Sequence, residues 1–316
     1  MAFAPKILKE NARLTLDRAP GNPRRITLIH EGVFIVVGIL LAVLNLLLTD
    51  AMNNAGGLSG MGTRTFLSTA LTALNLLQAV LAPFWSFGII FAALGFARAQ
   101  DVTTDALFAG FRRFGSCLRL MLVETLFTIA ACFMAVYTAS FLYSLMPMGN
   151  HLMALIEPVY EEFMADPYAT IAQLPIEDLT RSMLPLLTIT GLILTAILIP
   201  LQYFLRLSQY ILLDKPDTGA FAAVFKSFRY MKGNIVSFIK LDLSFWWYYT
   251  LNILITLIAY LDQLLPALGV NLPISPEAAN LIFYGLYALG LLCLAWFANP
   301  YVFTAYAQAY EIASNK

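Results

Sequence analysis

Long runs of apolar residues recur along the chain, and six of them are long enough to cross a bilayer as helices. A hydrocarbon core about 30 Å thick needs roughly 20 helical residues. The second run contains Pro83 and exceeds one crossing, but no loop residues interrupt it, so we predict one kinked or tilted helix. The predicted spans are residues 32–48, 66–97, 120–146, 184–205, 243–261 and 280–298, the last continuing as helix past Pro300 to Tyr310.

The composition supports a membrane protein. Of the 316 residues, 60% are hydrophobic and only 12% are charged, whereas a soluble domain carries about 25% charged residues. We therefore predict an all-α, polytopic bundle in which residues 32–312 form a single six-helix transmembrane domain. Residues 1–31 form a basic amphipathic segment before it, and residues 313–316 form a short tail.

Lysine and arginine residues predict the orientation, because they concentrate in cytoplasmic loops. With the N-terminus in the cytoplasm, six spans place all but Arg64 and Arg181 of the 19 basic residues on the cytoplasmic side. We expect a bacterial plasma membrane protein with both termini in the cytoplasm. The acidic segment 147–182 is then the largest outer loop.

Two segments between spans, residues 103–120 and 217–234, mix aromatic and basic residues at helical spacing. This pattern is typical of helices that lie on the membrane surface. We expect them on the cytoplasmic side, in contact with anionic lipids or with a protein partner. The net charge of zero gives no reason to expect nucleic acid as a partner.

The same two segments resemble each other, and each is followed by a span with an acidic residue near its start. These residues are Glu124 and Asp242, and Glu31 precedes the first span. The pattern suggests three diverged helical hairpins, although biased composition alone could produce part of the signal.

Asp242 and Glu124 need a cation or hydrogen-bond donors, because a carboxylate near a membrane core is costly without a partner. Arg206, at the inner end of the fourth span, is the candidate partner of Asp242, and Arg98 is the candidate for Glu124. We interpret both as buried ion pairs that join hairpins. The alternative is an ion or substrate relay, although these acids lie near helix ends rather than at mid-membrane.

Amide side chains are the main polar groups inside the spans. Asn75 and Gln78 share a helix face, and Asn252 lies in the fifth span. They either form hydrogen bonds between helices or line a substrate cavity. No lysine, arginine or histidine lies at mid-membrane, which argues against a pump with a central charged relay.

Catalytic, cofactor-binding and metal sites are not predicted. The GLSG motif at 57–60 matches a rhomboid-type nucleophile motif, but it lies in a loop and no histidine lies within a span. His151, Glu157 and Glu161 could hold a divalent cation, but we interpret them as a solvated acidic face. No P-loop, HExxH or dinucleotide fingerprint occurs, and three widely spaced cysteines make no metal pair.

Several short stretches resemble a family of bacterial integral membrane proteins catalogued as domain-of-unknown-function family 975. They are ILKENARLTL (7–16), YILLDKP (210–216), SFRYMKGN (227–234), KLDLSFWWY (240–248) and NPYVFTAYAQAYE (299–311). The resemblance rests on Leu8, Lys9, Ala12, Arg13, Asp214, Pro216, Ser227, Met231, Lys232, Gly233, Leu243, Ser244, Phe245, Pro300, Tyr301, Thr304, Ala307 and Tyr310. It implies a plasma membrane protein with about six helices and brings no established activity.

The sequence favours a non-enzymatic membrane scaffold or an accessory factor for transport or envelope assembly. The alternative is a carrier or exporter of a small amphipathic molecule, with a cavity between the hairpins. A cavity lined by Asn75, Gln78 and Asn252 would favour the carrier, and a tightly packed interior would favour the scaffold.

Overall fold

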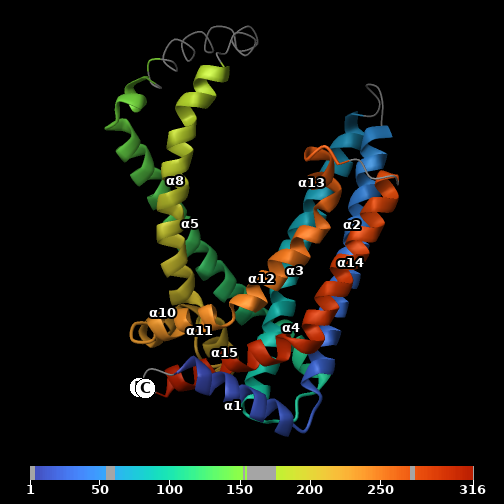
Figure 1. The fold of residues 1–316 in the computed structure, drawn as a ribbon, viewed down its shortest axis with the longest axis vertical. Helices are drawn as coiled ribbons and strands as arrows, with labels where there is room; N and C mark the ends of the chain where they lie inside the picture. The colour runs from blue at the N-terminus through green and yellow to red at the C-terminus, as the bar shows by residue number, and fades with distance from the viewer. Residues whose placement is uncertain (1–3, 55–60, 152–153, 155–175, 271–274, 316) are drawn as a thin grey trace. The chain divides into compact units, whose positions relative to one another are not determined.

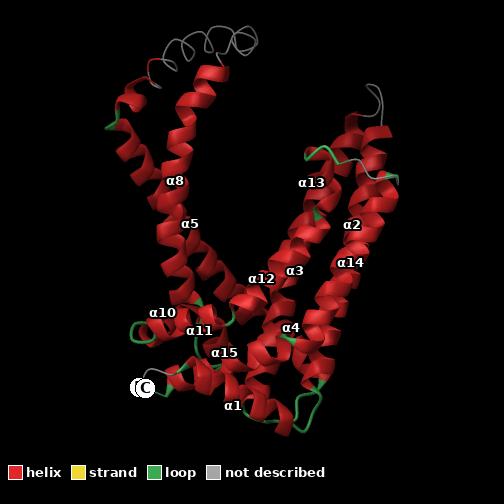
Figure 2. Ribbon diagram, viewed as in Figure 1, coloured by secondary structure: helices red, strands yellow, loops and turns green. Residues whose placement is uncertain are grey.

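A computed structural model describes residues 4–54, 61–151, 154, 176–270 and 275–315. Every regular element in these ranges is a helix (Figure 2). The predicted all-α class is therefore confirmed. The GLSG motif and most of the acidic segment 147–182 lie outside the described residues.

The helices form two compact units. The first unit combines Met1–Arg119 with Leu207–Lys316, and the second is Leu120–Arg206. Five described helices are long and apolar enough to cross a membrane, or six if one bent pair counts as a single span. This fits a membrane protein with several spans, whereas the six-span count, the three hairpins and the domain boundaries stay predictions.

The long helices of the first unit are α2 (Pro23–Asn54), α3 (Met61–Ala97), α12 (Trp246–Ala259) and α14 (Pro276–Phe297). As Figure 1 shows, α2 lies beside both α3 and α14, and α12 packs on α14. Helix α3 runs through Pro83 without interruption, which confirms the prediction of one helix there. The short helix α13 (Leu261–Ala267) follows α12.

The second unit contains most of α5 (Phe114–Ser144) and the whole of α8 (Ile176–Leu205). Tyr143, near the end of α5, donates a hydrogen bond to the Ser182 carbonyl of α8 at 2.5 Å. Ala131, Ala135 and Ala139 are buried at four-residue spacing along α5. Four-residue spacing places them on one helix face, where small side chains permit close packing.

The first unit also contains a group of shorter helices, which we call the short-helix layer; it lies at the lower end of Figure 1. Its central element is α15, which contacts α1, α2, α3, α10 and α14. The layer consists of α1 (Pro5–Arg18), η2 (Thr104–Phe108), α4 (Ala109–Arg112), α9 (Ser208–Asp214), α10 (Ala220–Met231), α11 (Ile235–Ser244) and α15 (Asn299–Ser314).

The layer packs tightly against the end of α3. A Cβ atom added to Gly88 would lie 1.9 Å from the Leu107 carbonyl oxygen, and one added to Gly110 would lie 2.1 Å from the Phe84 carbonyl oxygen. Both distances are far below van der Waals contact, so glycine is required at the two crossing points. A buried apolar cluster fills the same region and includes Ile26, Trp85, Ile89, Ala92, Phe96 and Leu107.

Two predicted spans have different bounds in the structure. The predicted fifth span, 243–261, is bent by 60° at Phe245, so its first residues belong to α11 and the long apolar helix starts at Trp246. The last predicted helix ends at Phe297, and α15 turns away from it after Ala298 (Figure 1). Pro300 fits the first turn of α15 because that position needs no N–H group.

Candidate functional site: the polar network of the short-helix layer and the adjacent pocket

Arg98 joins three helices at one side of the layer. It follows the end of α3, and it donates hydrogen bonds to Glu311 of α15 at 2.7 Å and to Asp214 of α9 at 2.6 Å. Burial disfavours the charged form of Arg98, but the two carboxylates outweigh this and raise its pKa. One cation therefore bridges two carboxylates that would otherwise repel each other.

Tyr310 extends this cluster into the core. Its side chain is fully buried, its hydroxyl donates to Asp214 at 2.9 Å, and its ring stacks on Tyr210 with centroids 5.5 Å apart. Burial raises the pKa of the Tyr310 hydroxyl, and the carboxylate of Asp214 raises it further. Asp214 thus accepts from two donors that reach it from different helices.

Asp242 lies in a second cluster, next to the bend at Phe245. It accepts hydrogen bonds from Tyr306 of α15 and from Tyr249 of α12, the latter at 3.3 Å. The two tyrosine hydroxyls are 2.6 Å apart. The carboxylate of α11 is therefore held by donors from two later helices, α12 and α15.

Lys9 of α1 fixes the bend itself. Its ammonium group donates to the Ser244 carbonyl at 2.8 Å and lies 4.8 Å from the ring centroid of Phe245, which is fully buried. Ser244 is the last residue of α11, where carbonyls lack helical donors. Burial lowers the pKa of Lys9. Lys9 thus stabilises the end of α11, which lies inside the fifth span predicted from the sequence.

The predicted ion pairs stay predictions. Arg206 and Glu124 belong to the second unit, whereas Asp242 and Arg98 belong to the first. Within its own unit, the guanidinium of Arg206 lies 5.8 Å from the ring centroid of Tyr203.

The predicted cavity residues lie apart from both clusters. Asn75 and Gln78 are exposed on α3, and the amide of Asn252 donates to the Tyr248 carbonyl of its own helix at 2.9 Å. None of the three lines the pocket described next.

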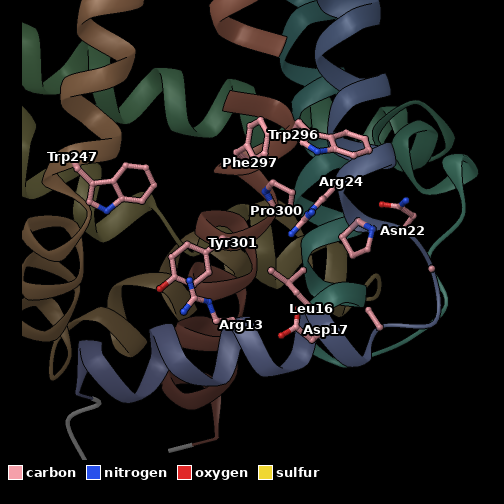
Figure 3. A pocket seen from close by; sticks show the side chains of 13 residues that line it. Arg13, Leu16, Asp17, Asn22, Arg24, Trp247, Trp296, Phe297, Pro300 and Tyr301 are labelled. Atoms are coloured by element: carbon pink, nitrogen blue, oxygen red, sulfur yellow. The ribbon is translucent and has the colours of Figure 1, made fainter. Parts of the chain in front are cut away.

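A pocket of about 630 Å³ lies beside the layer, where α1, α2, α12, α14 and α15 meet (Figure 3). Arg13 and Asp17 reach it from α1, and Arg24 reaches it from the first turn of α2. The rest of the lining is Leu16, Ala19, Gly21, Asn22, Pro23, Trp247, Trp296, Phe297, Pro300 and Tyr301. Charged and aromatic side chains therefore share one recess at the ends of two apolar helices.

Comparison with known proteins identifies a family. Residues 6–315 match the family model described as "Protein of unknown function (DUF975)". The curated proteins and the solved structures that were compared contain no match.

The residues that carry the family resemblance gather in the short-helix layer and at its pocket. Lys9 meets Ser244 and Phe245, and Asp214 meets Tyr310. Ser227 of α10 accepts a hydrogen bond from the backbone N–H of Leu207, next to α9. Three further motif residues, Arg13, Pro300 and Tyr301, line the pocket.

Several residues of the site carry no signal in the sequence beyond their residue type. Glu311 belongs to the Arg98 cluster, and Tyr306 belongs to the Asp242 cluster. The pocket contains Arg24, Trp247 and Trp296. The family motif supplies part of the missing signal, since Tyr306 and Glu311 lie within or beside its last stretch.

Proposed function

Because the chain belongs to the DUF975 family of proteins of unknown function, we propose a role that fits its shared residues. The protein is a non-enzymatic scaffold or an accessory factor for transport or envelope assembly in the bacterial plasma membrane. It presents a rigid short-helix layer at the cytoplasmic face. The observation that carries this proposal is that the family-type residues bind helices of the layer to one another.

The chemistry of the clusters supports a structural role. Arg98 is bound by two carboxylates, Lys9 by a helix-end carbonyl, and Asp242 by two hydroxyls. A catalytic or carrier site needs polar groups that remain available to a substrate. Here the same groups stabilise a fixed arrangement of helices.

The exposed side chains of α10, α11 and the first residue of α12 support a position at the membrane surface. Phe221, Phe225, Val236, Leu243 and Trp246 are exposed, and Trp246 has 66% of its surface accessible. Basic side chains accompany them, as expected for a helix that contacts anionic headgroups. These residues are Lys226, Arg229, Lys232 and Lys240.

A carrier of a small amphipathic molecule is the second candidate. Asn75 and Gln78 favour it, because two exposed amides on one face of an apolar helix need polar partners inside a membrane. Such partners are either another helix or a water-filled path.

The two candidates differ in the water access of these amides. In a variant without Cys117, Cys132 and Cys293, single cysteines replace Asn75 or Gln78, and an impermeant thiol reagent is applied to each side of sealed vesicles. The scaffold predicts protection from both sides, because lipid or protein covers the helix face. A cysteine at Lys232 is the control and is labelled from the cytoplasmic side only.

Labelling at position 75 or 78 would contradict the scaffold and favour the carrier. A scaffold is also expected to stay bound to its assembly after mild solubilisation. Native electrophoresis of solubilised membranes should then show a discrete band well above the 35.0 kDa chain. A band of the monomer alone would contradict the proposal.

A further inference from the structure

The pocket beside the short-helix layer has the chemistry of a lipid headgroup site. We propose that it binds the phosphate group of one anionic phospholipid, whose acyl chain lies along α14. This inference rests on the proposed function for the position of the layer at the bilayer surface. It goes further by assigning a discrete site rather than a diffuse basic surface.

Two arginines supply the positive charge. Arg13 and Arg24 come from different helices (Figure 3), and neither guanidinium forms an ion pair or a side-chain hydrogen bond within the described ranges. Asp17 is the single acidic residue of the lining, so the pocket carries a net positive charge. A guanidinium binds phosphate oxygens through two parallel hydrogen bonds, which suits a phosphodiester.

The first turn of α2 adds to this charge. Asn22 accepts from the backbone N–H of Arg25 through its side chain at 3.1 Å, and its carbonyl accepts from Ile26 at 3.3 Å. Asn22 therefore fixes the start of a 32-residue helix at the pocket wall. The positive end of that helix dipole stabilises an anion placed there.

The aromatic residues of the pocket fit the headgroup region. Trp247 and Trp296 line it from α12 and α14, and such rings favour the depth where apolar and wet surroundings meet. Tyr301 lies near Arg13, and burial raises the pKa of its hydroxyl despite that charge. The hydroxyl therefore remains a hydrogen-bond donor for a phosphate oxygen at neutral pH.

An acyl chain has a path away from the pocket. Phe297 belongs to the lining and has 74% of its surface exposed at the end of α14. Leu286 is also exposed, and it precedes Phe297 by about three helical turns, which places both on one face. These exposed apolar side chains favour a lipid over free phosphate as the ligand.

The test measures binding of phosphatidylglycerol to delipidated full-length protein by native mass spectrometry. The variant R13Q/R24Q is compared with R18Q/R25Q, which removes the same charge from the same two helices outside the pocket. We expect R13Q/R24Q to bind the lipid at least about tenfold more weakly than the wild type, because the loss of one charged hydrogen bond already weakens binding by about tenfold. The affinity of R18Q/R25Q should stay near that of the wild type.

Equal losses in the two double variants would overturn the site and leave only a diffuse basic surface. Displacement of the lipid by millimolar inorganic phosphate would overturn the lipid in favour of free phosphate, whereas displacement by dihexanoyl phosphatidylglycerol alone supports it. If R13Q/R24Q does not fold, as judged by thermal melting, R13K/R24K is used. It keeps the charge, loses the bidentate geometry and should bind more weakly than R18K/R25K.

The result is independent of the scaffold test. Lipid binding is measured on the purified chain, whereas the proposed function is judged by thiol labelling and assembly size in membranes. Failure of the headgroup site therefore leaves the scaffold proposal standing. If the scaffold proposal fails, the headgroup site is still judged by the comparison of R13Q/R24Q with R18Q/R25Q.

Discussion

Helices α14 and α15 are neighbours in the chain, separated by Ala298 alone, and they have opposite environments. Helix α14 is almost wholly apolar, yet half of its large apolar side chains are exposed, and Leu281 reaches 77%. Helix α15 carries hydroxyl, amide and carboxyl groups, yet most of its residues are buried. In this unit, the apolar helix α14 therefore supplies surface that faces lipid, and the helix of mixed composition, α15, lies in the protein core.

The difference shows where the first unit obtains its stability. In a membrane, apolar side chains gain little by leaving lipid for protein, so packing and hydrogen bonds decide which helices associate. The small buried residues Ala305, Ala307 and Ala309 let α15 approach its neighbours closely. Its tyrosines and Glu311 then make the polar contacts described above.

The largest expected effect comes from glycines at the layer. Gly88→Ala or Gly110→Ala inserts a methyl group against backbone atoms and should destabilise the protein by about 3 kcal/mol or more. Thermal melting in detergent measures the loss. Gly38→Ala on α2 and Gly285→Ala on α14 are controls, because nothing lies within 4 Å of an added Cβ there.

The controls should leave stability unchanged or raise it by up to about 1 kcal/mol, since alanine is the better helix former. Equal losses of stability in all four variants would show that the layer is packed no more tightly than the long helices.

Arg98→Gln should have the next largest effect. It leaves the carboxylates of Asp214 and Glu311 without their cation, which should lower the free energy of unfolding by about 2 kcal/mol. The loss is smaller than for a fully buried ion pair, because the guanidinium is one-third exposed and solvent screens it. Chemical or thermal unfolding in detergent gives the value. Arg112→Gln is the matched control, since its pair with Asp105 is long, at 3.6 Å, and exposed.

For Arg112→Gln we expect a loss near zero. The importance of the three-helix cluster would be refuted by an Arg98→Gln protein as stable as the Arg112→Gln protein.

Lys9→Met should lower stability by about 1–2 kcal/mol. The change removes the hydrogen bond to the Ser244 carbonyl and the contact with the Phe245 ring. Melting temperatures are compared with those of Lys6→Met, which removes an exposed lysine from the same helix. Similar losses in both variants would show that the bend at Phe245 does not depend on Lys9.

Tyr310→Phe should have the smallest effect at neutral pH, about 1 kcal/mol for one buried hydrogen bond. The raised pKa adds a pH signature. Above pH about 10 the unfolded chain loses the Tyr310 proton, whereas the folded protein keeps it. The stabilisation of the folded state by the Tyr310 hydroxyl is therefore full below that pH and declines as the pH rises further.

The melting temperature of the wild type should therefore fall more steeply above pH about 10 than that of Tyr310→Phe. Tyr284→Phe, at an exposed position on α14, is the control and should keep the wild-type slope. Identical slopes for wild type and Tyr310→Phe would contradict the assignment.

The long helices could be predicted because length and apolar character suffice for them. The bend at Phe245 could not, since residues 243–249 contain neither proline nor glycine. Tertiary contacts hold it instead, from Lys9 in α1 and from Tyr306 in α15. Local spacing contains no record of contacts made by such distant parts of the chain.

The polar network was partly predictable. Arg98 and Asp242 stand out because charge near an apolar run needs a partner. The partners of Arg98 lie 116 and 213 residues away, at Asp214 and Glu311, and no periodicity links them. The family motif does contain Asp214 and Tyr310, so a resemblance supplies information that spacing cannot.

The packing of α15 on α1 has a consequence for the order in which the protein assembles during synthesis. Gln308 donates to Thr15 at 3.0 Å, and the two residues are 293 positions apart. At about 5–20 residues per second, the ribosome adds α15 roughly 15–60 s after α1. For that interval α1 has no α15 to pack on, so the contacts between these two helices form only after α15 has been synthesised.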